Sequence, residues 1–295
     1  MEWLVAPFEV GFVQRALWGG VLVALICALA GTWVVLRGMA FLGDAMSHGM
    51  LPGIALASLL GGNLLAGAAV SAVVMAAGVT VVGRSPRLSQ DTSIGLLFVG
   101  MLSLGVIVVS RSQSFAVDLT GFLFGDVLAV RRDDLVLLGI ALALALTVSV
   151  LGYRPFVALA FDERKAHTLG LRPKAAHAAL LGLLTLAIVT SFHIVGTLLV
   201  FGLLIAPPAT VLPWARRIPV IMAGAAVLGS AAVFLGLLVS WYAGTAAGAT
   251  VSAVAVLQFL LSHLAAGCRG GRLRPTRRAS TLIARPGPRT DKVPS

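Results

Sequence analysis

Long apolar runs alternate with short polar stretches over most of the chain. Nine of these runs come close to the roughly 20 residues that a helix needs to cross a bilayer, at residues 16–36, 41–60, 64–83, 92–110, 133–153, 175–192, 194–212, 218–240 and 247–266. The pattern predicts an all-α fold, a polytopic membrane helix bundle with about nine transmembrane helices. Eight or ten spans stay open as alternatives.

The composition changes this picture little. Hydrophobic residues fill 59% of the 295 positions and charged residues 11%, whereas soluble domains are about 45–50% apolar and about 25% charged. The mean hydropathy is +1.01. We therefore expect one transmembrane domain over residues 1–266 rather than several soluble domains.

The net charge of +11 is concentrated at the C-terminus. Eight of the 22 basic residues lie in the last 27 positions, together with a single acidic residue, Asp291. Residues 267–295 are therefore predicted to form a basic, disordered cytoplasmic tail that can touch membrane lipid. A positive charge confined to this tail is no sign of nucleic-acid binding.

Basic residues in the short loops predict the orientation. The connection from Arg154 to Lys174 holds five of them and marks the cytoplasmic side. Alternation from there places ten loop cations inside and four outside. The C-terminus then lies in the cytoplasm and the N-terminus outside.

The second apolar run contains two residues with metal-binding chemistry. Asp44 and His48 stand four positions apart, so both lie on one face of a helix. A carboxylate beside a neutral imidazole suits zinc or manganese, and two copies of the pair at a dimer axis make four ligands. An internal Asp–His hydrogen bond that ties helices together is the alternative. Pro52, one turn later, is expected to kink this helix.

Two further segments are informative. FDERKAHTLGL, Phe161–Leu171, predicts a short amphipathic cytoplasmic helix with Asp162 as N-cap and Gly170 after its end, able to lie on lipid or on a soluble partner. In the run from His193 to Pro213, Pro207 and Pro208 are expected to break or bend the helix.

No nucleotide-binding loop of the form G-x-x-x-x-G-K-[ST] is present, and no hydrolase or C-x-x-C motif. The chain is therefore not expected to be an enzyme. If ATP drives transport, the nucleotide site must lie on another polypeptide.

Five ordered segments resemble the permease subunits of zinc/manganese ABC importers, the ABC-3 family. They are VVLRGMAFLGDAMSHGMLPGIAL (Val34–Leu56), DTSIGLLF (Asp91–Phe98), VDLTGFLFGDVLAV (Val117–Val130), FDERKAHTLGL (Phe161–Leu171) and VGTLLVFGLLIAPPAT (Val195–Thr210). The third segment is closer in appearance to the zinc permeases, so zinc is preferred and manganese comes next. No cofactor is implied, because the metal is the transported substrate.

The resemblance implies a homodimer of permeases in the bacterial inner membrane, with cytoplasmic ABC ATPase subunits and an extracytoplasmic metal-binding protein. It assigns metal contact to Asp44 and His48. It makes the Phe161–Gly170 segment the coupling helix that seats in the ATPase, through Phe161, Asp162, Glu163, Ala166, Leu169 and Gly170. Asp118 and Asp126 would lie at an external gate or entry.

One segment departs from the family pattern, because Gly244 and Ala246 stand where an Asp and a Pro are common. Other readings remain open. A proton-coupled secondary metal transporter would use Asp44 and His48 as a proton relay, and an ABC permease for a siderophore or cobalamin would need a larger, aromatic-lined cavity. An intramembrane metalloenzyme is the weakest alternative.

Overall fold

The computed structural model describes residues 6–83, 89–110, 127–161 and 173–270. These residues are almost entirely helical, and no strand occurs among them. The helices are α2 (Gly11–Leu36), α3 (Ala40–Gly49), α4 (Leu51–Leu59), α5 (Leu64–Val82), α6 (Gln90–Ser110), α8 (Arg132–Leu151), α9 (Tyr153–Phe161), α11 (Pro173–Val211), α12 (Ile218–Ala243) and α13 (Ala247–Gly270), with 3-10 turns η1 (Ala6–Glu9) and η3 (Val127–Ala129).

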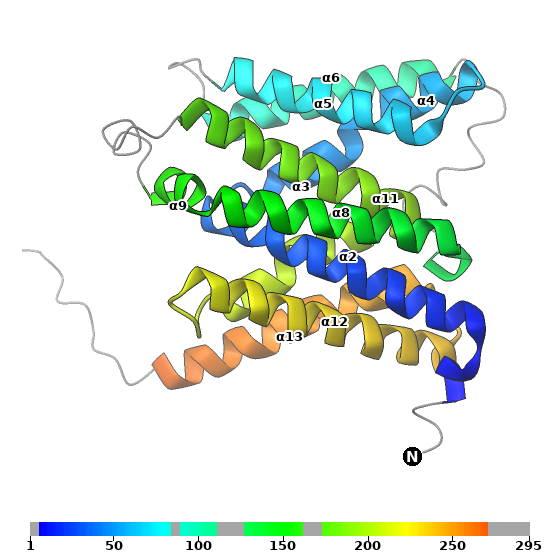
Figure 1. The fold of residues 1–295 in the computed structure, drawn as a ribbon, viewed down its shortest axis with the longest axis vertical. Coiled ribbons are helices and arrows are strands. Elements are labelled where there is room, and N and C mark those ends of the chain that lie inside the picture. The colour runs from blue at the N-terminus through cyan, green and yellow to red at the C-terminus, as the bar shows by residue number, and fades with distance from the viewer. Residues whose placement is uncertain (1–5, 84–88, 111–126, 162–172, 271–295) are drawn as a thin grey trace, which may run out of the picture.

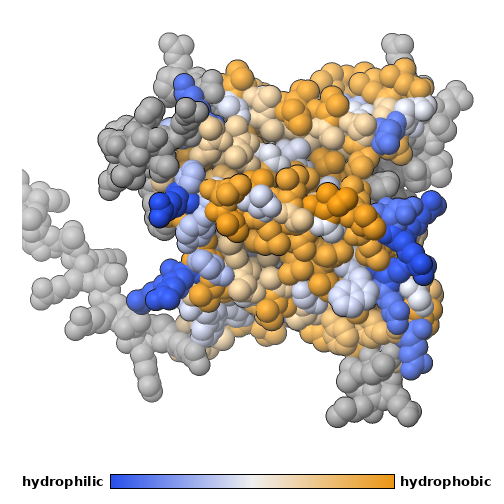
Figure 2. Space-filling model, in the orientation of Figure 1, coloured by the Kyte–Doolittle hydropathy of each residue, from blue (hydrophilic) through white to orange (hydrophobic). Residues whose placement is uncertain are grey.

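The long helices pack alongside one another as a bundle, and each runs between the two polar ends of the molecule. Seven helices in the described part of the chain are long and apolar enough to span a membrane. Hydrophobic side chains cover the middle of the face in Figure 2, and hydrophilic ones gather at its left and right ends. The described chain begins and ends at opposite ends of the bundle (Figure 1). This arrangement confirms the predicted polytopic helical membrane fold.

Each of the nine apolar runs corresponds to helix in the structure, but two of them are not long uninterrupted spans. The run 41–60 is divided at Met50 into α3 and α4. The run 194–212 forms a shorter helix, Val195–Val211. The count of about nine is therefore close, with seven long helices, one short helix and one divided pair among the described residues.

The chain reverses direction inside α11. Gly196 has φ 75° and ψ 168°, a conformation open essentially only to glycine. His177 bonds to Arg37, while Leu204 lies against Gly31. A straight helix would separate residues 177 and 204 by about 40 Å, yet their partners on α2 are only about 9 Å apart. The first segment (Pro173–Phe192) and the second segment (Val195–Val211) therefore run in opposite directions along α2.

The helix does not break at the two prolines of the second segment. Pro207 and Pro208 stand inside it, and it continues to Val211. Because Pro208 has no N–H, the carbonyl of Leu204 four residues earlier loses its helical donor. This carbonyl lies so close to Gly31 that a Cβ there would collide with it. The expected interruption is found at Gly196 instead.

The turn between α12 and α13 explains one departure from the family pattern. Gly244 ends α12 with φ 65°, in the left-handed conformation, which glycine adopts at helix ends without strain. Ser240 supports the turn by donating its hydroxyl to the carbonyl of Thr245 at 2.6 Å. Glycine at this position therefore has a structural role in closing the helix.

Candidate functional site: a carboxylate–imidazole pair beside a helix break

Asp44 and His48 lie on the more exposed face of α3. The other face of α3 is buried through Leu42, Ala45 and Met46. The side chain of Asp44 is 34% exposed and that of His48 is 23% exposed in the single chain. Both residues share one face of the helix, as their spacing requires.

The two side chains are close without being hydrogen-bonded. The Nε2 atom of His48 lies 3.6 Å from Oδ1 of Asp44, which is beyond hydrogen-bond range. The other ring nitrogen, Nδ1 of His48, is buried and has no hydrogen-bond partner. The contact between the two side chains is therefore one of charge rather than a short hydrogen bond, and both the metal-ligand assignment and the Asp–His alternative stay predictions.

Aromatic rings form one wall beside the pair. The ring of Phe98 on α6 packs edge-on against His48, with centroids 5.7 Å apart, and against Phe41 at 5.6 Å. Phe41 is itself 42% exposed, three residues before Asp44 on the same face of α3. The ring of Phe98 limits the directions from which water or an ion can approach the imidazole.

The second segment of α11 supports α3 from behind. A Cβ at Gly43 would lie 2.7 Å from Cδ2 of Leu204 and 3.9 Å from a ring carbon of Phe201. Leu204 is fully buried and also lies against Gly31 of α2. Gly43, the residue before Asp44, therefore packs against the fully buried side chain of Leu204.

The helix that carries the pair ends directly after it. α3 stops at Gly49 and α4 starts at Leu51, with Pro52 in the first turn of α4. The hydroxyl of Ser71 on α5 donates to the carbonyl of Gly49 at 2.8 Å. A serine from a neighbouring helix is one way to satisfy backbone groups at a break within a membrane. The expected interruption near Pro52 is thus present.

Within the described part of the chain, the pair is incomplete as a metal site. Among the described residues, no group of three His, Cys, Asp or Glu side chains could hold a metal ion. Two ligands fall short of the four or more that zinc and manganese sites use. Further ligands would have to come from water, from backbone, from a second molecule or from residues outside the described part of the chain.

The structure also contains an apolar groove. It has a volume of about 330 Å³ and runs between the second segment of α11 and α13. Phe201, which lines it, also lies next to Gly43. Its other lining residues are Leu198, Gly202, Ile205, Ala206, Ala209, Ser252, Val256 and Phe259. Phe201 is thus shared between this groove and the packing behind α3.

The remaining predicted site residues lie largely outside the described part of the chain. Phe161 is the last residue of α9, and its side chain is not among those described. The positions Asp118, Asp126, Asp162, Glu163, Ala166, Leu169 and Gly170 also fall outside the described residues. Their assignments stay predictions.

Sequence reasoning missed several residues that shape the site. Ser71, Phe98, Phe201 and Leu204 come from three other helices, and no spacing along the chain links them to Asp44. It also left residues 154–160 in a connecting loop, where the structure has α9 (Tyr153–Phe161). Only Gly43, next to Asp44 and unable to fill space, was a local signal that another helix approaches closely.

The fold is that of a polytopic helical membrane protein. The chain belongs to the ABC 3 transport family, whose model matches residues 9–266. The residues that carried the resemblance in the sequence lie within this range. The chain is thus the membrane subunit of an ABC transporter, and the ATPase is a separate chain.

Known relatives cover most of the chain. A manganese transport system membrane protein, MntC, from Halalkalibacterium halodurans is 37% identical over 252 residues, which are 85% of this chain and 86% of that protein. A chelated iron transport system membrane protein, YfeD, from Yersinia pestis is 33% identical over 256 residues, or 87% and 86% of the two chains.

A solved structure shares the fold. PsaBC from Streptococcus pneumoniae in complex with Fab matches with a TM-score of 0.78 and 32% identity, covering 88% of this chain and 94% of that one. The arrangement of helices described here is therefore shared with a solved structure.

Proposed function

We propose that this chain is the permease of an ABC importer that carries Mn²⁺ into a bacterial cell. The observation that carries the proposal is the half-exposed Asp44–His48 pair with an unpartnered imidazole nitrogen. A charged group within a membrane is costly unless a partner, a cavity or an ion compensates it. A passing divalent cation is such a compensating partner.

Manganese is the preferred substrate, ahead of zinc. Sequence patterns alone gave zinc a slight preference, since carboxylate and imidazole ligands serve both metals. The relatives named for their metal in the comparisons above are a manganese and an iron protein. The carboxylate and the water-accessible position of the pair are compatible with Mn²⁺.

The pair would become a four-ligand site in a homodimer. Two copies related by a twofold axis each bring one carboxylate and one imidazole. The count of donors supports this, because the described residues offer no third His, Cys, Asp or Glu ligand beside the pair and a second copy would supply two more. The site would then open alternately to the two sides of the membrane, and it must bind weakly enough to release the ion.

Other parts of the transporter would drive this change. Cytoplasmic ATPase subunits would seat on the Phe161–Gly170 segment, and an extracytoplasmic binding protein would deliver the metal near Asp118 and Asp126. In this orientation Arg37, Lys174, Arg216 and Arg217 face the cytoplasm, together with the C-terminus, in agreement with the distribution of loop cations.

The proposal is tested by Asp44→Leu and His48→Phe, which keep bulky side chains at both positions and remove the ligand atoms, and by the milder Asp44→Asn and His48→Gln, which leave only weaker amide oxygens. Uptake of radioactive Mn²⁺ is measured in cells that express the whole transporter and lack other manganese importers. We expect Asp44→Leu and His48→Phe each to lose uptake by at least about tenfold, equivalent to about 1.4 kcal/mol of metal binding.

The matched control is Asp133→Asn, which removes an exposed carboxylate from the first turn of α8. It should transport as the wild type does. Wild-type uptake in both Asp44→Leu and His48→Phe, at equal amounts in the membrane, would rule out the proposed site. A loss of Zn²⁺ uptake with unchanged Mn²⁺ uptake would reverse the metal assignment.

A further inference from the structure

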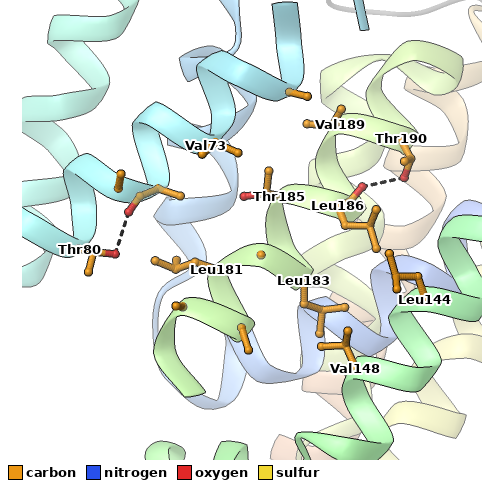
Figure 3. Close-up of a pocket in the computed structure, with 16 residues that line it drawn as sticks. Val73, Thr80, Leu144, Val148, Leu181, Leu183, Thr185, Leu186, Val189 and Thr190 are labelled. Atoms are coloured by element: carbon orange, nitrogen blue, oxygen red, sulfur yellow. Dashed lines mark hydrogen bonds between the residues drawn. The ribbon is translucent and has the colours of Figure 1, made fainter. Parts of the chain in front are cut away.

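A second, larger groove lies away from the metal pair. It has a volume of about 630 Å³ and runs between α5, α8 and the first segment of α11 (Figure 3). Ala178 and Gly182 form part of its floor, with Val73 on one side and Leu144 and Val148 on the other. The volume is in the range of small-molecule sites, which are about 300–1,000 Å³.

The length of the groove matches one leaflet of a bilayer. Its lining on α11 extends from Ala178 to Thr190, which is about 18 Å along the helix. The hydrocarbon core of a bilayer is about 30 Å thick. A guest in this groove would therefore reach from one membrane surface to just beyond the middle.

The lining is apolar and carries no charged residue. Two of its three hydroxyl groups are already used, since Thr80 donates to the carbonyl of Ala76 and Thr190 to that of Leu186. The hydroxyl of Thr185 has no hydrogen-bond partner, and its side chain points toward α5 (Figure 3). A change of rotamer would let Thr185 donate to the carbonyl of Leu181, as threonines in helices often do.

Two cationic residues of the described chain stand at one end of the groove. Lys174 is exposed and lies four residues before Ala178, on the same face of α11. Arg154 is also exposed, six residues after Val148. Figure 3 shows Val148 beside Leu183, nearer the start of α11 than Leu144 beside Leu186. Both cations are therefore placed at the end where α11 begins.

We propose that this groove binds one acyl chain of an anionic phospholipid, with the lipid phosphate at Lys174. An apolar channel the length of one leaflet with a cation at its mouth has the chemistry of a phospholipid. Basic residues near the cytoplasmic ends of membrane helices attract anionic headgroups. A transmembrane helix of a partner is a poorer fit, because it would need a groove along the full 30 Å of the core.

The first test fills the groove. A side chain at Gly182 would enter open space, as no atom lies within 4 Å of the position of a Cβ there, so Gly182→Leu should fold normally. The full-length chain is delipidated in detergent and titrated with dioleoyl phosphatidylglycerol, and bound lipids are counted by native mass spectrometry. The affinity of the tightest lipid should fall by about tenfold or more.

Gly139→Leu on α8 is the matched control, since Gly139 also has no neighbour within 4 Å and does not line the groove. It should bind phosphatidylglycerol as the wild type does. Equal affinity of wild type and Gly182→Leu would overturn the proposal, and so would equal losses in Gly182→Leu and Gly139→Leu.

Two more variants identify the guest. Lys174→Gln should remove the preference for phosphatidylglycerol over dioleoyl phosphatidylcholine while leaving phosphatidylcholine binding unchanged. Thr185→Val should keep the affinity for phosphatidylglycerol, because a hydrocarbon chain does not need the hydroxyl. Loss of binding in Thr185→Val would overturn the acyl-chain assignment in favour of a guest with a polar atom at mid-membrane. None of these readouts depends on metal transport.

Discussion

The two sides of Leu204 are built in different ways. On one side, the seam between α2 and the second segment of α11 brings backbone against backbone at Gly31, and neighbouring side chains such as Cys27 are fully buried. On the other side, α3 carries the half-exposed Asp44 and His48. The seam is complete within one chain, whereas the α3 face keeps an imidazole nitrogen without a partner. Stability therefore depends on a tightly packed surface of Leu204, whereas the proposed function depends on a neighbouring surface that stays accessible to an ion.

The largest expected effect comes from breaking the seam. In Gly31→Val a side chain would collide with the carbonyl of Leu204, and neither backbone can move alone. We expect a loss of about 3 kcal/mol or more, enough to remove folded protein from the membrane. Maleimide labelling of the buried Cys27 during heating measures this, in a Cys268→Ser background because Cys268 is exposed.

Gly139→Val is the control for that experiment, because its Cβ has open space around it. Cys27 in Gly139→Val should become labelled at the same temperature as in the wild type. If Cys27 in Gly31→Val also stays unlabelled up to the temperature at which the wild type becomes labelled, the seam is not the rigid element that the packing indicates.

A smaller effect is expected from the other side of Leu204. In Gly43→Leu the new side chain would meet the flexible end of Leu204 rather than backbone, so the fold should survive with a cost of about 1–3 kcal/mol. Because Gly43 adjoins Asp44, Mn²⁺ uptake should fall while the amount of folded protein changes little. Uptake per folded transporter is the measurement.

The double variant Gly43→Leu with Leu204→Ala tests the cause. It removes the colliding atoms and should recover much of the uptake, since residues in contact show coupled effects. If the loss of uptake in the double variant equals the sum of the losses in Gly43→Leu and Leu204→Ala, α3 is not positioned through Leu204.

The smallest of these effects concerns the helix break. Ser71→Ala removes the hydroxyl that bonds to the carbonyl of Gly49, and it should cost about 1 kcal/mol. The labelling temperature of Cys27 should fall by a few degrees at most, and uptake should fall slightly. Ser110→Ala, at an exposed helix end, should have no effect. A collapse of folding in Ser71→Ala would mean that the break needs this bond to exist.

Much of the fold could be predicted because hydrophobic length and helix length are directly related in a membrane. The adjoining runs 175–192 and 194–212 were separated correctly even without a polar loop between them. The site was predicted only as far as one helix allows, since the spacing of Asp44 and His48 fixes their common face. Phe98 and Leu204 could not be predicted, because their contact with α3 depends on how α6 and α11 pack in three dimensions.

The reversal at Gly196 also constrains how the protein is made. The two segments of α11 meet at Gly196 without a hydrophilic linker. We therefore expect that one segment does not enter the lipid while the other remains in the aqueous channel of the insertion machinery. The nascent chain must deliver both segments together as a closed hairpin. A substitution that prevents the left-handed turn would therefore act during biosynthesis, before any transporter is assembled.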